Sequence, residues 1–133
     1  MEAMDERRIW QRVRGAEDQT ERLRGCLAKQ GLLLGVYRTL SRRGGKGRQL
    51  YEQKQNQIAC LRGVLRVLTG QTIAPPRSAE GAVDLLRCHA GELEFLRELT
   101  ELSRDDALGP VFETLRERQK CQCRLLLELI GTM

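Results

Sequence analysis

Aromatic residues, prolines and histidine are scarce in this chain, and it has no long apolar run. Aromatics make up 4% of the 133 residues, so aliphatic side chains must form the core, and few rings remain on which nucleic-acid bases could stack. The prolines are Pro75, Pro76 and Pro110, which leaves long helices uninterrupted elsewhere. No apolar run approaches the roughly 20 residues that span a bilayer, and the charged N-terminus lacks the apolar stretch of a signal peptide. We therefore expect a cytoplasmic protein that does not enter the membrane.

The cysteine pattern argues against disulfides and against a zinc site. The count of five is odd, and the chain contains no Cys-x-x-Cys pair. Cys121 and Cys123 are two residues apart, so on a helix they point about 200° apart and cannot bind one ion. We expect reduced thiols, with Cys60 and Cys88 packing near helix seams as small hydrophobic side chains.

The signals that are present are those of helices. Apolar residues recur every three to four positions over long stretches, which predicts an all-α protein built as a four-helix bundle over residues 18–133. The first two helices are expected at 18–43 and 48–69. The third is expected to start at the N-cap Ser78 and to end before the turn at Asp105, and Pro110 fits the first turn of the fourth.

Two connections complete the expected single domain, residues 1–133. Gly15 and Ala16 are expected to separate an N-terminal arm or short helix, residues 1–16, from the first long helix. The segment around Pro75 and Pro76 must be extended and is long enough for a crossover along the bundle. Two glycines in the middle of the first helix, Gly31 and Gly35, suggest that another helix approaches it closely.

Polar residues occupy the centres of the apolar seams. In the fourth helix, Gln119 and Gln122 continue a spacing of threes and fours that also includes Phe112, Leu115 and Leu126. In the third helix the seam is expected to run through Glu92, Leu96 and Leu99. Buried amides and charges are unfavourable without partners, so we expect the six central polar residues to meet: Gln30, Lys54, Gln57, Glu92, Gln119 and Gln122.

This layout resembles the ferritin-like di-iron carboxylate proteins, and specifically their small rubrerythrin-like members. That family takes one Glu from each of two helices and a Glu-x-x-His pair from each of the other two. From the first to the fourth expected helix, this chain has one, two, one and two central polar residues. The two residues of each pair are spaced i, i+3, as in that family. The resemblance covers residues 23–133 and is carried by stretches such as LYEQKQNQIACLRGVLRVLTG and GPVFETLRERQKCQCRLLLELIG, together with the mid-chain crossover.

The resemblance implies a di-iron site whose ligands have been replaced. Gln30 stands at a carboxylate position, Lys54 and Gln57 stand for one Glu-x-x-His pair, and only Glu92 keeps a ligand-type side chain. The second pair is replaced by Gln119 and Gln122. The missing anionic and imidazole ligands, and the added ammonium, lead us to expect no metal, no cofactor and no catalytic residue. Lys54 and Glu92 should form a buried pair, closed by the four amides.

Two further residues next to the layer, Tyr37 and His89, are also expected to have structural roles. Tyr37 lies two turns after Gln30 on the same face, and we expect a core tyrosine bonded to the layer. His89 lies one turn before Glu92, and we expect an ordinary partly buried or surface histidine.

The sequence therefore favours a non-catalytic ferritin-like protein with a structural or partner-binding role, and a homodimer is one assembly that we consider. One alternative is a metal-binding or redox protein that uses Glu92, His89 and a cysteine. A second is a basic helical module for nucleic acid or an acidic protein, because the net charge is +5 and arginines cluster near the N-terminus and around residues 42–48.

Overall fold

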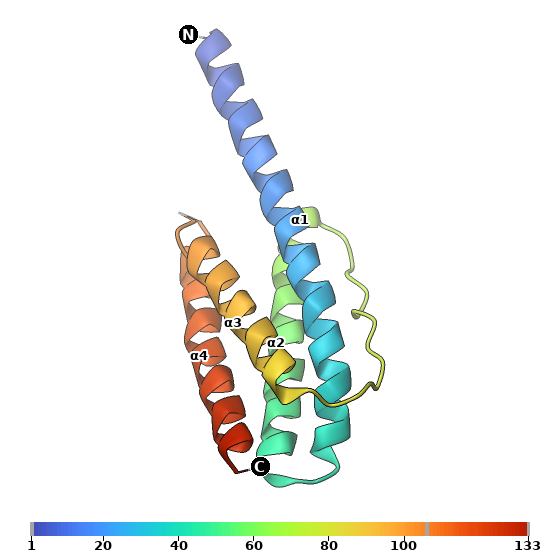
Figure 1. Cartoon of the computed structure of the whole chain (residues 1–133). Helices are drawn as coiled ribbons and strands as arrows, with labels where there is room; N and C mark the ends of the chain where they lie inside the picture. Colours follow the sequence, from blue (N-terminus) through green and yellow to red (C-terminus); the bar gives the residue numbers. More distant parts are fainter. Residues whose placement is uncertain (1, 106, 133) are drawn as a thin grey trace.

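The computed structural model describes residues 2–105 and 107–132, with the side chains from Gly15 onward except that of Ala16. This part of the chain folds into four helices, which pack as a four-helix bundle (Figure 1). Their bounds are α1 Glu2–Ser41, α2 Gly45–Thr69, α3 Leu85–Leu102 and α4 Gly109–Gly131. Within the described ranges, none of the helices is both long enough and apolar enough to cross a membrane.

The helices are connected as two hairpins joined by a crossover (Figure 1). A tight turn with positive φ at Gly44 and Gly45 joins α1 to α2, and a short turn joins α3 to α4. Between the hairpins, residues 71–84 run along the bundle beside α1, so that α2 and α3 point in the same direction. The predicted all-α bundle and its mid-chain crossover are confirmed.

The predicted break at Gly15 and Ala16 is wrong. A single helix α1 of 40 residues runs through both positions, and its first part projects beyond the other helices (Figure 1). A glycine inside a helix costs only about 1 kcal/mol, and alanine is the best helix former. Without a proline, these two residues are too weak a signal to end the helix.

The predicted start of the third helix is also wrong. The N-cap is Asp84, whose side chain accepts a hydrogen bond from the Arg87 backbone N–H at 3.1 Å. Ser78 lies in the crossover, where its hydroxyl is 3.1 Å from a guanidinium nitrogen of Arg38 on α1. The crossover must extend to residue 84 to reach the far end of the bundle, so the local capping signal of Ser78 is overridden.

Gly31 and Gly35 face the crossover, where the sequence suggested a neighbouring helix. A Cβ at Gly31 would lie 2.5 Å from the Arg77 carbonyl oxygen, and one at Gly35 would collide with the Ala79 carbonyl oxygen. The absent side chains therefore let an extended segment lie directly on α1.

We expect Gly35→Ala to lower the free energy of unfolding by about 1–3 kcal/mol, because the methyl group must displace backbone. The matched control is Gly63→Ala in α2, where a Cβ would meet nothing within 4 Å. That change should raise stability by up to about 1 kcal/mol through helix propensity. Urea denaturation measures both, and equal stabilities for the two variants would contradict the close contact.

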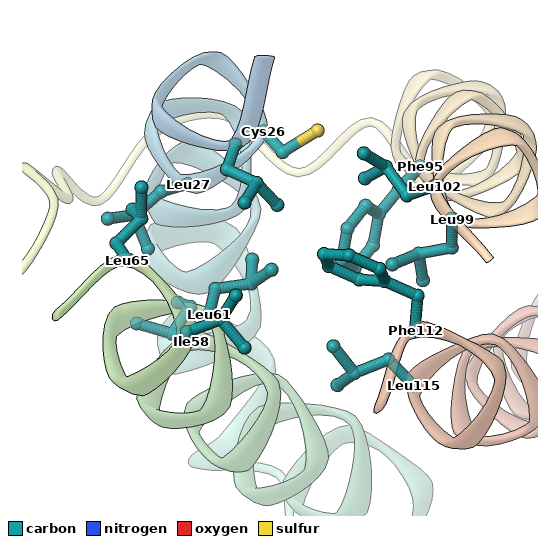
Figure 2. Close-up of a cluster of buried hydrophobic side chains, with 12 residues drawn as sticks. Cys26, Leu27, Ile58, Leu61, Leu65, Phe95, Leu99, Leu102, Phe112 and Leu115 are labelled. Atoms are coloured by element: carbon teal, nitrogen blue, oxygen red, sulfur yellow. The ribbon is translucent and has the colours of Figure 1, made fainter. Parts of the chain in front are cut away.

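The core consists of two apolar clusters on either side of the central polar residues. The larger one takes side chains from all four helices, which point toward one another in Figure 2, and includes Leu23, Leu61, Leu99 and Phe112. The smaller one is formed by Tyr37, Leu40, Leu50, Cys88 and Leu126. The bundle is thus held from both ends by aliphatic packing, and a polar section lies between.

Candidate functional site

The polar section is centred on the ammonium group of Lys54, which is completely buried. Its Nζ donates to Glu92 Oε1 at 2.6 Å, in an ion pair with no exposed surface on either side chain. It also donates to the amide oxygens of Gln30 at 2.6 Å and Gln57 at 2.7 Å. An ammonium group has three N–H donors, so every donor of Lys54 is used.

Glu92 is held in place by three donors from different helices. Besides Lys54, the Tyr37 hydroxyl of α1 donates to Oε2 at 3.0 Å, and Gln119 Nε2 of α4 lies 3.1 Å from Oε1. Gln119 also donates to the Glu92 backbone carbonyl at 2.8 Å, and its Oε1 accepts from Gln57 Nε2 at 2.8 Å. The sequence-based expectation for Tyr37 is confirmed, and the network links all four helices.

Gln122 is the one predicted member that no hydrogen bond joins to this network among the described residues. It is fully buried and donates through Nε2 to the Leu50 carbonyl oxygen at 3.1 Å. Its Oε1 is buried without a partner in the part of the chain that the structure describes. Leu50 lies one turn before Lys54, so Gln122 belongs to the same level of the bundle but is bonded to the α2 backbone.

Sequence reasoning missed Phe95. Its ring centroid lies 5.1 Å from Lys54 Nζ, within the range of a cation–π interaction. Phe95 is 2% exposed, whereas Leu96, which the predicted seam used, is half-buried. The sequence contains the signal, because 88, 92, 95, 99 and 102 alternate by four and three, as a helix seam does.

Burial acts on the protonation of the groups in and around the layer. It lowers the pKa of Lys54, and the adjacent Glu92 carboxylate opposes this shift. It raises the pKa of Tyr37 well above its ordinary value, so the hydroxyl stays protonated and donates to Glu92. Burial also raises the pKa of Cys88 and of Cys123 to about 11, so both thiols are protonated at neutral pH.

His89 stays outside the hydrogen-bonded network in the described part of the chain. It is half-buried, and its Nε2 is buried without a hydrogen-bond partner there. No group of three or more His, Cys, Asp or Glu side chains that could hold a metal ion is found among the described residues. Both oxygens of Glu92, the central carboxylate, already accept hydrogen bonds.

All five cysteines are free thiols. Three are buried, and burial raises the pKa of Cys26, like those of Cys88 and Cys123, to about 11. Cys121 is exposed on α4, and Cys60 is partly exposed on α2.

Comparison with models of protein families, with curated proteins and with solved structures gives no match for this chain. The interpretation of the polar layer therefore rests on its geometry and on the layout of polar residues in the sequence.

Proposed function

We propose that the protein is a ferritin-like bundle that works without a metal ion and serves as a structural, partner-binding unit. The observation that carries this proposal is the position of Lys54 Nζ, which contacts oxygens of Gln30, Gln57 and Glu92 at 2.6–2.7 Å. A positive charge already fills the centre where the resemblance implies a cation. The charges of Lys54 and Glu92 cancel, so the layer is neutral without an added ion.

The remaining contacts support the same interpretation. Each oxygen of Glu92 accepts a hydrogen bond from the protein, and a divalent ion would have to displace the ammonium or repel it at short range. Di-iron and related sites rely on several carboxylates and imidazoles. Here a single carboxylate, that of Glu92, is bonded to Lys54. Three of the other groups bonded to this pair are the neutral amides of Gln30, Gln57 and Gln119.

The experiment is elemental analysis of the purified protein together with thermal unfolding in added ferrous, manganous and zinc ions. We expect no stoichiometric metal and no rise in the melting temperature of the parent. One or two ions per chain, or a clear metal-dependent stabilisation, would favour the metal-binding alternative through Glu92, His89 or a cysteine.

The partner-binding part of the proposal rests on the outer face shared by α2 and α4, which we call the neutral face. Helix spacing places on it Gln49, Gln53, Asn56, Cys60, Gly63 and Val67 of α2, and Val111, Thr114, Arg118, Cys121 and Leu125 of α4. Arg118 is the one charged residue among these positions, in a chain with 31% charged residues. One turn beyond this set, Lys46 of α2 and Glu128 of α4 form an ion pair at 3.8 Å. Further ion pairs, such as Arg22–Glu98 and Lys29–Glu94, join α1 to α3.

A second copy of the chain is the partner that this face fits best. Copies with a net charge of +5 repel each other, and the neutral face brings few like charges together; charge depletion is also typical of interface cores. At about 1.5 Å per residue, α2 is about 38 Å long and α4 about 35 Å long. Packed about 9 Å apart, they offer a strip of roughly 650 Å² per partner, somewhat less than the roughly 800 Å² of a standard interface. A hollow of about 410 Å³ beside Asn56 and Cys121 can receive side chains of the partner.

Light scattering after size exclusion tests the neutral face. We expect the parent to run as a dimer of about 30 kDa, twice the 15.2 kDa of one chain. Asn56→Arg, which adds charge beside Arg118, should shift it to the monomer, while the control Ala90→Arg on the exposed side of α3 should remain dimeric. A monomeric parent, or dissociation by both variants alike, would count against this interface.

A further inference from the structure

The oxygens around Lys54 form a cage with a defined shape. Three acceptors, from Gln30 on α1, Gln57 on α2 and Glu92 on α3, lie at 2.6–2.7 Å from one nitrogen atom. The Phe95 ring lies near the same nitrogen, with its centroid 5.1 Å away. The fourth direction from the nitrogen is taken by the carbon chain of the lysine itself.

Two of the oxygens are fixed by contacts that do not involve Lys54. Tyr37 and Gln119 donate to Glu92 at 3.0 and 3.1 Å, and the Gln57 amide group donates to Gln119 at 2.8 Å. The apolar clusters above and below hold the helices that carry these residues. The cage therefore does not depend on the lysine side chain for most of its geometry.

We propose that these three oxygens are a binding site for a primary ammonium ion, RNH₃⁺, which the side chain of Lys54 fills from within. This inference rests on the proposed metal-independent function and names the class of ion that the layer recognises. The Lys54 side chain acts as a tethered ligand of the site.

The geometry fits an ammonium group and does not fit a divalent metal ion. Charge-assisted N–H···O bonds are about 2.7–2.9 Å long, close to the observed contacts. Mg²⁺ demands about 2.0–2.1 Å in octahedral geometry, and Ca²⁺ takes about six to eight oxygens at about 2.3–2.6 Å. One carboxylate also matches a single positive charge. An emptied cage should therefore accept a small alkylammonium ion in preference to a divalent metal.

A hollow at the surface ends against two residues of the cage. A hollow of about 240 Å³ between α1 and α3 is lined by Gly25, Gly91, Gln30 and Phe95, among others. Gln30 and Phe95 are the two of these residues that also contact Lys54. The hollow is bordered by exposed side chains of surface ion pairs, such as Lys29 with Glu94.

The variant Lys54→Ala tests the site, because alanine keeps Cβ and the missing atoms are those of n-propylammonium. At about ten times its dissociation constant, n-propylammonium should raise the melting temperature of this variant by about 3 °C or more. n-Propanol, which has the same chain but no charge, and Mg²⁺ at equal ionic strength should have no such effect. The parent and Lys54→Met, whose side chain fills the space, should not respond to the amine.

A second charge change tests the ligand set. Adding Glu92→Gln to Lys54→Ala should reduce the stabilisation by n-propylammonium several-fold, while adding Glu117→Gln, on the exposed surface of α4, should leave it unchanged. Equal responses to amine and alcohol, or equal responses in Lys54→Ala and Lys54→Met, would overturn the proposal.

The parent offers a test that does not depend on the folding of Lys54→Ala. The chain has four lysines, and the other three, Lys29, Lys46 and Lys120, have exposed or partly exposed side chains. With nitrogen-15 lysine, Lys54 should give a slowly exchanging ammonium signal at neutral pH that is lost in Lys54→Met. A neutral amine or a rapidly exchanging group at Lys54 would reject the cage. Metal bound by the parent would instead reject the proposed function, so the two failures are distinguishable.

Discussion

Replacement of Glu92 by alanine is expected to destabilise the protein by about 3–5 kcal/mol, the largest effect of any single change proposed here. The substitution leaves the fully buried ammonium group of Lys54 without its carboxylate and removes the acceptor of Tyr37. A buried group that loses its partner keeps its desolvation penalty. Chemical denaturation monitored by circular dichroism measures the change.

Two variants give this prediction its controls. Glu94 lies on α3, as Glu92 does, and Glu94→Ala breaks its exposed ion pair with Lys29 of α1. Because exposed pairs contribute only about 0–1 kcal/mol, this change should leave the free energy of unfolding nearly unchanged. The double variant Glu92→Ala with Lys54→Met removes both charges and should recover much of the loss. If Glu92→Ala were no less stable than Glu94→Ala, the pair would not be buried in solution.

On the proposed ferritin-like interpretation, introducing a di-iron ligand set should convert the protein into one stabilised by metal. The change keeps Glu92 and combines five substitutions: Gln30→Glu, Lys54→Glu, Gln57→His, Gln119→Glu and Gln122→His. Without metal this variant should be less stable than the parent, because four carboxylates crowd a low-dielectric site. Ferrous or manganous ion at about 100 times its dissociation constant should raise its melting temperature by about 8 °C or more.

The parent is the control for this experiment and should show no metal-dependent shift. Among the five substitutions, Gln122→His has the weakest structural support as a metal ligand. The Gln122 side chain is bonded to the Leu50 carbonyl oxygen and not to the network. A variant that keeps the parent's helix content but gains nothing from metal would contradict the ferritin-like interpretation of the layer while leaving the bundle intact.

The fold and the members of the layer were largely predictable because a helix seam is a strong periodic signal. Gln30, Lys54 and Glu92 were assigned to the interior by their spacing, and all are buried. Phe95 was missed because Phe95 and Leu96 are both apolar and both lie about one turn after Glu92. Their neighbours on the seam, rather than their own identity, decide which of them faces the core.

The remaining differences come from interactions that no local pattern contains. Ser78 has a good capping side chain, but the crossover needs the residues up to Asp84 to span the bundle. Gly35 indicated that another part of the chain approaches α1 closely. The sequence did not indicate that this part is the extended crossover and not a helix. The direction of each hydrogen bond, such as that of Gln122 toward Leu50, depends on side-chain rotamers set by the assembled helices.

The polar layer also fixes how the helices are aligned along the bundle axis. Leucine-rich seams alone tolerate a shift of one helix by a turn, about 5.4 Å, because one aliphatic contact replaces another. Here such a slip would move Glu92 or Gln119 away from its partners and leave the Lys54 ammonium facing leucines. The cost of that mismatch excludes shifted assemblies, in the way that a single buried polar residue sets the register of a coiled coil. A chain poor in aromatic side chains thus acquires a unique helix alignment from the buried pair of Lys54 and Glu92 and the amides bonded to it.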